Sequence, residues 1–507
     1  MADQQRINLA RIIESHDDDR VALISRGVET TYGDLRDQVD RLRGGLIGAG
    51  VGAGDRVALL CGNNTYFVVS YLAVIGLGAT AIPLNPNSPA LEIERELGVV
   101  EPKMMIVGPS AVAAWGQVDP AAVAKIDNVV FAEGDAPDGV RSLDELLGAE
   151  PAPVVDVEPD DVAVMMFTSG TAGLPKAAML SHHNLLVNIE QDLTARDHIN
   201  EGDIVYGVLP MFHIFGLNVM LGVGLAVGAT LVLVQRFDPA TAVQSIVKRQ
   251  VTVVPGAPPM WIAFSHFDEL PADTFASIRL AVSGASRLSP TVADRMRERF
   301  DLDIHEGYGL TEASPVVTSS AGISGRPGSV GRVLRGQEVR LVGDDGEEVP
   351  VGDAGEVWVR GENVFLGYLD EPEATGRVLV DGWLRTGDIA TVDDDGYLYL
   401  VDRAKDLIIV SGFNVFPGEV EQVLQTHPDV TEVGVLGVPH PHQGEAVKAY
   451  VVLEDGGDID EDQLIDYARD YLARYKCPSK VMFVDQLPRN AAGKLIRREL
   501  EGTVLDG

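Results

Sequence analysis

The sequence predicts an α/β protein with a large N-terminal domain of stacked, mostly parallel sheets with helices and a small β subdomain, followed by a small α+β C-terminal domain. Three patterns support this. Apolar strand-like runs alternate with helix-like periodicity to about residue 310, which is typical of parallel α/β construction. Short alternating strands separated by Gly/Asp turns follow from about residue 325. A third pattern begins after Asp402, so we expect domains at residues 1–401 and 402–507.

The first domain opens with a helix and continues as buried strands. Leu35, Val39, Leu42 and Leu46 give the segment before Ala49 one apolar helical face. Several of the expected strands end at glycine or proline, at the carboxyl edge where α/β sheets bind their ligands. These strands are Val130–Phe131, Val162–Phe167, Val205–Leu209, Thr252–Pro255 and Leu280–Ser283.

The two later patterns predict smaller units. The small antiparallel unit is expected to contain Ser329–Val333, Glu338–Val342 and Glu356–Arg360. In the last domain, a helix starting at Asp460 accompanies strands near 432–438 and 447–453, and Gln463 completes a capping-box pattern. The expected apolar face of that helix comprises Leu464, Tyr467, Ala468, Tyr471, Leu472 and Tyr475.

Composition narrows the class of protein. The 507 residues are 46% hydrophobic and 23% charged, which is globular composition. A formal net charge of −36 argues against nucleic acid or an anionic membrane as partner. The two cysteines, Cys61 and Cys477, allow no disulfide framework, and the N-terminal residues lack the pattern of a signal peptide. We therefore expect a cytoplasmic location.

One stretch, Ile214–Val234, is apolar and long enough to cross a membrane. It contains four glycines, and Gly228-Ala229-Thr230 leads into the strand-like Leu231–Val234. Residues 66–84 repeat this order. Both segments fit a buried helix followed by a buried strand of a covered sheet, so we expect no transmembrane segment.

A glycine- and hydroxyl-rich stretch, residues 168–176, follows the strand ending at Phe167. Its hydroxyls and glycines suit a polyphosphate because they combine donors with close backbone approach, and a lysine adds a cation. The stretch is not a Walker A loop, because Pro175 stands where a second glycine is required. The predicted phosphate ligands are Thr168, Ser169, Gly170, Thr171, Gly173 and Lys176.

Four further motifs are individually weak. Tyr308–Glu312 offers a ring, a hydroxyl and a carboxylate, but also fits a capped turn. Asp388 in Arg385–Asp388 fits either ribose binding or a turn cap. His213 on an apolar run is more often a core histidine, and Lys494 after Gly493 is ordinarily a solvated surface lysine.

Taken in order, these motifs resemble the acyl-adenylate-forming superfamily of acyl-CoA synthetases, adenylation domains and luciferases. Asp402–Arg403, Ser411–Pro417 and Pro488–Lys494 extend the resemblance over almost the whole chain. The similarity is greatest to fatty acyl-CoA synthetases, through Arg474–Pro478. The resemblance implies an AMP-forming acid–thiol ligase that makes an acyl-AMP from ATP and transfers the acyl group to coenzyme A.

The resemblance also implies roles for single residues. The expected catalytic residues are Lys494, His213, Lys176, Thr311 and Glu312, with Glu312 holding Mg²⁺. Adenine is expected at Gly284, Ala285, Ser286, Tyr308 and Gly309, the ribose at Asp388 and Arg403, and the pantetheine of CoA at Ser411, Gly412 and Phe413. Asp402 is the expected hinge of a mobile C-terminal domain, and a homodimer is a further expectation from the family.

The expected acyl pocket is largely apolar. Its candidate residues are His213, Phe215, Val254, Trp261, Gly307 and Gly309, and the segments that carry them contain no evident lysine or arginine to pair a second carboxylate. We therefore expect a fatty or similar apolar carboxylic acid. An aryl or terpenoid acid, and transfer of the acyl group to a carrier protein in place of CoA, remain open. Ala172 and Ala177 depart from the family pattern. Ala172 removes one hydroxyl that would bind phosphate, and loss of a single neutral hydrogen bond costs about 0.5–1.5 kcal/mol.

Overall fold

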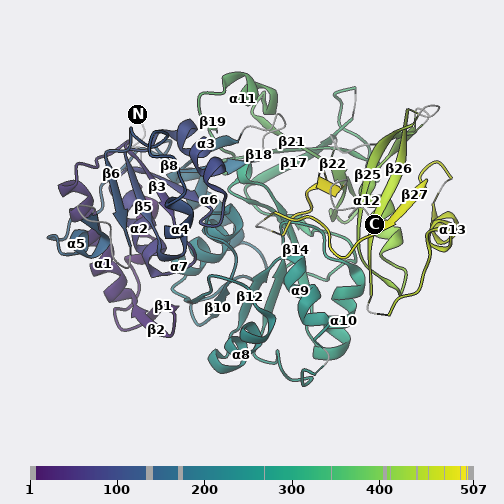
Figure 1. The fold of residues 1–507 in the computed structure, drawn as a ribbon, viewed down its shortest axis with the longest axis horizontal. Coiled ribbons are helices and arrows are strands. Elements are labelled where there is room, and N and C mark those ends of the chain that lie inside the picture. Colours follow the sequence, from purple (N-terminus) through teal and green to yellow (C-terminus); the bar gives the residue numbers. More distant parts are fainter. Residues whose placement is uncertain are drawn as a thin grey trace.

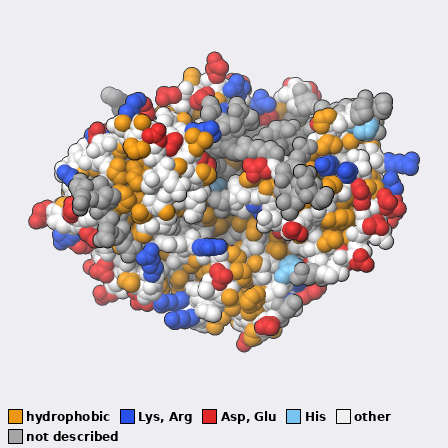
Figure 2. Space-filling view, in the orientation of Figure 1, with side chains coloured by type: hydrophobic (Ala, Val, Ile, Leu, Met, Phe, Trp, Pro, Cys, Tyr) orange, Lys and Arg blue, Asp and Glu red, His pale blue; other side chains and the backbone are white. Residues whose placement is uncertain are grey.

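The computed structural model describes residues 7–132, 141–168, 175–267, 269–343, 345–403, 408–410, 413–440, 444–454, 456–472, 474–490, 493–497 and 499–500. The side chains of residues 402, 403, 409, 413, 414 and 444 are not described. Figure 1 shows the large N-terminal body on one side and the smaller C-terminal domain on the other. Acidic side chains are spread over the face seen in Figure 2, in line with the formal net charge of −36.

The first large sheet has eight strands in the order β19-β9-β8-β4-β3-β5-β6-β7. The strands from β8 through β4, β3, β5 and β6 to β7 all pair in parallel with their neighbours. Strands β8 and β9 form an antiparallel hairpin. Its strands are β3 (Arg56–Leu60), β4 (Thr80–Leu84), β5 (Met104–Val107), β6 (Asn128–Phe131), β7 (Arg141–Ser142), β8 (Val162–Thr168), β9 (Lys176–Ser181) and β19 (Gly367–Tyr368).

The second large sheet has nine strands in the order β16-β15-β14-β13-β12-β10-β11-β1-β2. The run from β14 to β1 is parallel, and the two edges are antiparallel. Its strands are β1 (Val21–Ser25), β2 (Val28–Thr31), β10 (Ile204–Gly207), β11 (Thr230–Leu233), β12 (Val253–Gly256), β13 (Leu280–Ser283), β14 (Ile304–Gly309), β15 (Val316–Ser319) and β16 (Arg332–Val333).

Buried helices join these two sheets into one hydrophobic core. A single cluster of buried side chains runs from β3, β4 and β8 through α2 (Thr65–Gly76) and the π-helical segment η3 (Phe215–Val223) to β10 and β11. The segment at 214–234 is therefore a buried helix followed by a strand, as expected. No helix among the described residues is long and apolar enough to cross a membrane.

The remaining helices of the body cap or cover the sheets. Several begin at side-chain caps, such as the Thr31–Asp34 capping box of α1. They are η1 (Leu9–Ile13), α1 (Tyr32–Gly48), α3 (Ala90–Val100), η2 (Pro109–Ala111), α4 (Val112–Trp115), α5 (Leu143–Leu147), α6 (His182–Asp192), α7 (Gly224–Ala226), α8 (Pro239–Arg249), α9 (Pro258–Ser265), α10 (Pro290–Phe300), η4 (Thr311–Ala313) and α11 (Pro372–Val378).

A five-stranded sheet forms the small β subdomain, with β22 joined to β21. Its strands are β17 (Gln337–Val342), β18 (Gly355–Gly361), β20 (Leu379–Val380), β21 (Trp383–Val392) and β22 (Leu398–Arg403). The expected strand at 329–333 contributes only β16, which pairs with β15 in the nine-stranded sheet. Asp402 and Arg403 lie in β22, opposite Ile389 and Asp388 of β21.

The C-terminal domain has its own sheet and core, as the sequence predicts. Its elements are β23 (Ile408–Val410), β24 (Phe413–Val415), α12 (Pro417–Leu424), β25 (Val430–His440), β26 (Gly444–Leu453), α13 (Glu461–Tyr471) and β27 (Lys480–Phe483). The predicted apolar face of α13 is partly wrong. Leu464 and Ala468 are buried together with Ile465, whereas Tyr471 in the last turn is 63% exposed.

Candidate active site

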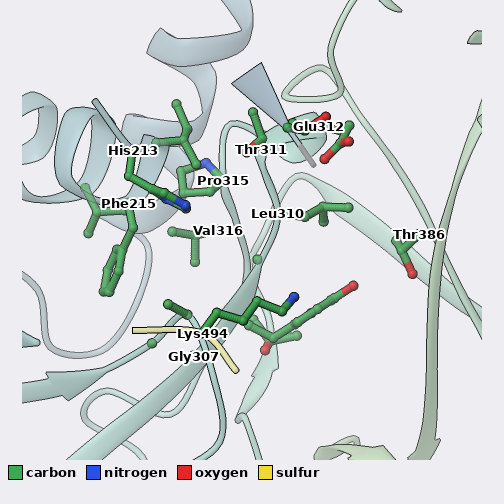
Figure 3. A pocket seen from close by; sticks show the side chains of 18 of the residues that line it. His213, Phe215, Gly307, Leu310, Thr311, Glu312, Pro315, Val316, Thr386 and Lys494 are labelled. Carbon is green, nitrogen blue, oxygen red and sulfur yellow. The ribbon is translucent and has the colours of Figure 1, made fainter. Parts of the chain in front are cut away.

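A cavity of about 940 Å³ lies where the two large sheets, the small β subdomain and the C-terminal segment meet. Strands β12, β13 and β14 lead into it, and Thr168 and Lys176 line it from the β8–β9 hairpin. Figure 3 shows His213, Thr311, Thr386 and Lys494, which come from separate elements, around one space. Predicted site residues in its lining are Thr168, Lys176, His213, Phe215, Gly284, Ala285, Gly307, Tyr308, Gly309, Thr311, Glu312 and Lys494.

Lys494 enters this cavity from the C-terminal domain and shares it with His213. A tight turn carries the lysine: its backbone N–H donates to Asn490 Oδ1 at 2.8 Å, and Gly493 has a φ of +79°. A side chain at Gly493 would come within 3.2 Å of Pro259, so the turn packs closely against the large body. The structure thus brings together two residues that lie far apart in the sequence.

His213 begins the turn before η3 and is neutral at pH 7. Burial and, to a lesser extent, the positive charge of Lys494 lower the pKa of His213 to about 4. Its Nδ1 has no hydrogen-bond partner among the described residues. A neutral imidazole at this position can accept or donate a hydrogen bond without adding charge.

Lys176, Glu312 and Tyr368 form a second group in the cavity. Tyr368 donates a hydrogen bond to Glu312 Oε1 at 2.6 Å, and Lys176 Nζ lies 5.2 Å from the centre of the Tyr368 ring. Burial and the Glu312 charge raise the pKa of Tyr368, so its hydroxyl stays protonated and donates. Tyr368 arrives by pairing of β19 with β9, a tertiary contact that local sequence does not signal.

The nucleotide-binding candidates occupy the wall between β13, β14 and β21. Gly284, Ala285, Tyr308 and Gly309 line the cavity, whereas Ser286 is not part of the lining. Tyr308 donates from its hydroxyl to Asp388 Oδ2 at 2.7 Å, and both residues are buried. Asp388 itself does not line the cavity and lies behind Tyr308. Arg385, Thr386 and Gly387 line it directly.

The acyl-pocket candidates divide into two groups. Phe215, Gly307 and Gly309 line the cavity. Val254 and Trp261, which were expected in its wall, lie in the hydrophobic core instead, both with 0% exposure. Side chains alternate along β12, so Val253 and Pro255 face the cavity and Val254 faces the core.

Several predicted residues lie outside the described part of the chain. These are Ser169, Gly170, Thr171 and Gly173 of the phosphate stretch, together with Ser411 and Gly412. For Asp402, Arg403 and Phe413 only the backbone is described. Thr168 and Lys176, which flank the phosphate stretch, are paired in the β8–β9 hairpin.

The cavity also contains residues that the sequence analysis missed. Glu96 of α3 is 8% exposed, and its Oε2 has no hydrogen-bond partner among the described residues. Asp192 and His198 line a different part of the cavity. An amphipathic helix pattern does not distinguish a carboxylate that turns toward an internal cavity from one that faces solvent.

Side-chain contacts join the C-terminal domain to the body. Glu454 accepts from Arg295 at 3.4 Å and lies 3.1 Å from His266 Nε2. Arg287 of the body reaches the backbone carbonyl oxygen of Gly418 at 3.5 Å. These contacts fix the arrangement in which Lys494 reaches the cavity.

Glu312 offers a metal ion one carboxylate. The described residues contain no cluster of three or more acidic, histidine or cysteine side chains that could hold a metal. Mg²⁺ in nucleotide enzymes is usually bound by one or two carboxylates together with substrate phosphates and water. The donor set around Glu312 and Lys176 fits that kind of ion and not an all-protein metal site.

Comparison with known proteins agrees with this geometry. A family model described as AMP-binding enzyme matches residues 9–369, and one described as AMP-binding enzyme C-terminal domain matches residues 419–494. A feruloyl-CoA synthase from Amycolatopsis sp is 37% identical over 94% of this chain and 94% of its own length. A 4-coumarate–CoA ligase 3 from Oryza sativa subsp. japonica is 34% identical over 95% of this chain and 88% of its own length.

The solved structures include the anthranilate CoA ligase AuaEII in complex with anthranoyl-AMP. It has a TM-score of 0.92 at 27% identity and covers 98% of this chain and 97% of its own. These matches confirm the resemblance to acyl-adenylate-forming enzymes and the predicted fold class. They also confirm the expectation of an AMP-forming acid–CoA ligase.

Proposed function

We propose a substrate and residue roles for this chain from the premise that it belongs to the AMP-binding enzyme family. The proposed substrate is an aryl carboxylic acid, which the enzyme activates with ATP and joins to coenzyme A. The carrying observation is that Lys494, Lys176, Glu312 and His213 line one cavity whose remaining wall includes Phe215.

The first step brings two anions together. A carboxylate oxygen of the acid attacks the α-phosphorus of ATP, and the bond to pyrophosphate breaks. Lys494 is placed to stabilise negative charge that develops around this centre, and Lys176 to hold the departing phosphates. Glu312 is the residue that would hold Mg²⁺, which when bound neutralises phosphate charge.

His213 has a positioning role in this scheme. Because its ring is neutral at pH 7, it can hydrogen-bond to the acyl carboxylate without pairing with it as a cation. Tyr308 would face the adenine, and Asp388, which accepts from the Tyr308 hydroxyl, would fix the orientation of that ring. Ribose binding by Asp388 and Arg403 stays a prediction.

The second step needs space for a thiol. The CoA sulfur attacks the acyl carbon, a thioester forms, and AMP leaves with the electrons of the broken acyl–phosphate bond. Lys494 fills part of the cavity beside His213, so its domain must move for the thiol to enter. Asp402 as hinge, residues 1–401 and 402–507 as the moving bodies, and CoA binding at Ser411–Phe413 are parts of this proposal.

Two considerations favour an aryl acid. The described cations in the lining, Lys176, Arg377, Arg385 and Lys494, belong to β9, α11, β21 and the C-terminal segment, and none comes from the strands β12 to β15 that form the acyl wall. That wall therefore suits an apolar group. The relatives named above act on ferulate and 4-coumarate, and the solved neighbour holds anthranoyl-AMP. A fatty acid is the alternative substrate, and a cytoplasmic location and a homodimer remain predictions.

A panel of carboxylic acids tests the proposal. AMP release would be measured with ATP and Mg²⁺, with and without CoA, for cinnamate, 4-coumarate, benzoate, octanoate and palmitate. We expect CoA-dependent AMP release with the aryl acids at higher kcat/KM than with the two fatty acids. Preference for palmitate or octanoate would overturn the aryl assignment, and AMP release that does not depend on CoA would indicate a different acceptor.

A further inference from the structure

The cavity continues inward along the strands of the nine-stranded sheet. Val253 and Pro255 of β12 line it, as do Leu280 and Val282 of β13. Gly493 packs against Ala257 just beyond the carboxyl end of β12, so Lys494 enters at that end. With a rise of about 3.3 Å per residue, the four steps from 280 to 284 span about 13 Å. The inner end of the cavity is therefore at the amino-terminal edge of these strands.

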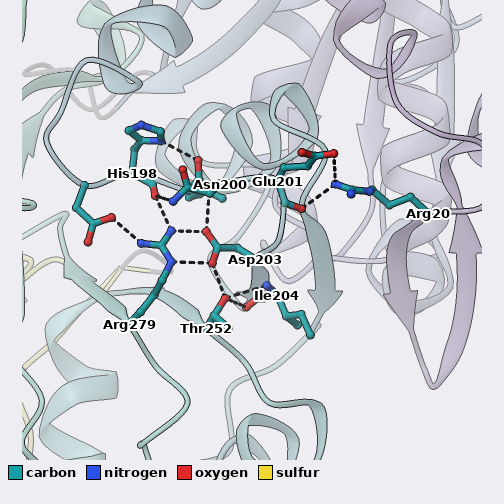
Figure 4. Close-up of polar contacts among 10 residues, drawn as sticks. Arg20, His198, Asn200, Glu201, Asp203, Ile204, Thr252 and Arg279 are labelled. Carbon is teal, nitrogen blue, oxygen red and sulfur yellow. Dashed lines mark hydrogen bonds and ion pairs between the residues drawn. The ribbon is translucent and has the colours of Figure 1, made fainter.

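A loop held by Arg279 closes this inner end (Figure 4). Arg279 donates to Asp203 Oδ1 at 2.8 Å, to Asp197 Oδ1 at 2.6 Å and to the carbonyl oxygen of His198 at 2.6 Å. Thr252 adds a hydrogen bond to Asp203 at 2.7 Å. Arg279, Asp203 and Thr252 immediately precede β13, β10 and β12, so the loop from 193 to 203 is fixed to the sheet edge.

Arg279 pairs with the carboxylates of Asp203 and Asp197 but not with that of Asp192. Asp192, the last residue of α6, is half-buried and lines the cavity. Among the described residues no hydrogen bond or ion pair joins its carboxylate to another group. A carboxylate at a helix C-terminus also faces the negative end of the helix dipole. Burial raises the pKa of Asp192 to about 6, and the charge of His198 opposes the rise. His198, which follows six residues later, lines the same cavity.

His198 also lines the cavity and leaves one ring nitrogen available. Its Nδ1 lies 2.9 Å from the carbonyl oxygen of Ile199, which only accepts, so Nδ1 carries a hydrogen. In the neutral ring Nε2 is then an acceptor, and no described residue bonds to it. Asp192 and His198 thus present hydrogen-bond acceptors at the inner end, about 13 Å by strand rise from the reacting end.

We propose that Asp192 and His198 form a subsite that recognises a hydrogen-bond donor, a hydroxyl or amino group, on the ring end of the acid farthest from its carboxylate. This inference rests on the proposed function and names its substrate class more closely. An acid that lacks the donor leaves the Asp192 carboxylate without a partner in the bound state. Sites of this kind discriminate strongly because the unpaired polar group is on the protein.

Wild-type enzyme tests the inference with matched acids. The kcat/KM for AMP release with CoA would be measured for 4-coumarate, 4-aminocinnamate, cinnamate and 4-methoxycinnamate. We expect 4-coumarate or 4-aminocinnamate to exceed both cinnamate and 4-methoxycinnamate by about 10- to 100-fold, the range of a hydrogen bond to a charged group. Equal values for all four acids would overturn the subsite while leaving the aryl ligase in place.

Three variants then assign the preference to residues. Asp192→Leu should reduce the ratio of 4-coumarate to cinnamate to about 1, and Asp192→Asn should give an intermediate ratio because its amide oxygen still accepts. Glu201→Gln, on the exposed part of the same loop, should keep the wild-type ratio. A wild-type ratio in Asp192→Asn and Asp192→Leu would overturn the inference. If Asp192→Leu does not fold, Asp192→Asn and the wild-type panel decide.

Failure of the subsite and failure of the proposed function give different results. Without AMP release from any of the four aryl acids, the aryl assignment fails and the subsite with it. Release from all four at equal efficiency removes the subsite alone. Titration calorimetry with 4-coumarate and cinnamate, without ATP, is an independent readout in which we expect tighter binding of 4-coumarate to wild type and a smaller difference in Asp192→Asn.

Discussion

The two ends of the cavity differ in the cations that they present to a substrate. The outer end contains Lys494 and Lys176, whereas the inner end contains Asp192 and His198. The outer end is assembled from both large sheets, the small β subdomain and the C-terminal segment. The strands and the closing loop of the inner end belong to the nine-stranded sheet and its connections. In the proposed function the outer end serves the phosphate chemistry that every substrate shares, and the inner end serves the choice of acid.

The largest expected effect comes from removing the Lys494 cation of the outer end. Lys494→Ala should lower acyl-AMP formation by roughly 100- to 1,000-fold, the range for loss of one group that stabilises transition-state charge. ATP–pyrophosphate exchange measures this step. Lys480→Ala, an exposed lysine on β27 of the same domain, should keep wild-type exchange. Equal exchange in wild type and Lys494→Ala would remove Lys494 from the reaction.

A larger side chain in the acyl wall should impair binding of the acid without impairing binding of ATP. Around a side chain at Gly307, the Thr318 carbonyl oxygen at 3.0 Å is the single close neighbour, so a larger residue extends into the cavity. Gly307→Val should raise KM for the aryl acid about 10-fold or more through steric exclusion, with little change in KM for ATP. Gly98→Ala, which meets nothing within 4 Å, is the matched control. A rise in both KM values would show that the ends are coupled.

The outer end also contains a buried carboxyl that should destabilise the fold. Burial, with the Glu92 charge adding to it, raises the pKa of Glu96 to about 8. Between its unfolded pKa of about 4.3 and its folded value, the native state binds more protons, so this group lowers stability as pH rises. Glu96→Gln should raise the free energy of unfolding by about 1–3 kcal/mol at pH 7 to 8 and by little below pH 4.5.

Thermal melts over pH 4 to 9 measure that effect. Arg95→Gln on the exposed side of the same helix, outside the cavity lining, should change stability by less than about 0.5 kcal/mol. A Glu96→Gln gain that is the same at pH 4 and pH 8 would contradict a titrating, buried Glu96. A gain that appears only at high pH would distinguish the two carboxyl groups. Glu96 would lower the stability of the fold, whereas Asp192 is proposed to bind a ligand.

The smallest expected effect concerns the contact that holds Lys494 in place. Glu454→Gln weakens the contacts with His266 and Arg295, both partly exposed pairs worth less than about 1 kcal/mol. Adenylation should fall about 2- to 5-fold, while thioester formation from preformed acyl-AMP should not fall. Asp466→Asn, whose partner Arg469 is on the same helix, is the control. Equal loss in both half-reactions would contradict a contact specific to the first step.

The sequence was most informative where chemistry is carried by short local patterns. Lys176, Thr311, Glu312 and Lys494 could be proposed because their motifs, some weak alone, occur in the order of the family that the sequence resembles, and the structure brings them to one cavity. The strand at 280–283 was predicted to the residue because the apolar run is short and ends at a glycine, which favours a buried strand over a helix. The β8–β9 hairpin was not predicted, since alternating helices and strands suggested parallel pairing throughout that region.

Residues whose position depends on tertiary contacts could not be found in the same way. Tyr368 reaches Glu312 through strand pairing, and His198 is held at the inner end because its loop is tied to Arg279. Val254 and Trp261 show the opposite error. Both are apolar and close in sequence to the pocket, but strand alternation and helix packing turn them into the core. Apolar character alone does not separate a pocket wall from a core.

The separate origin of the two ends has a practical consequence for redesign. Thr168 and Lys176 belong to the eight-stranded sheet, whereas Val253, Leu280 and Val282 belong to the nine-stranded sheet. Saturation libraries over the second set leave untouched the β8–β9 hairpin, which is proposed to bind ATP. New acid specificities can then be screened with a common AMP-release assay, without re-optimising nucleotide use for each variant.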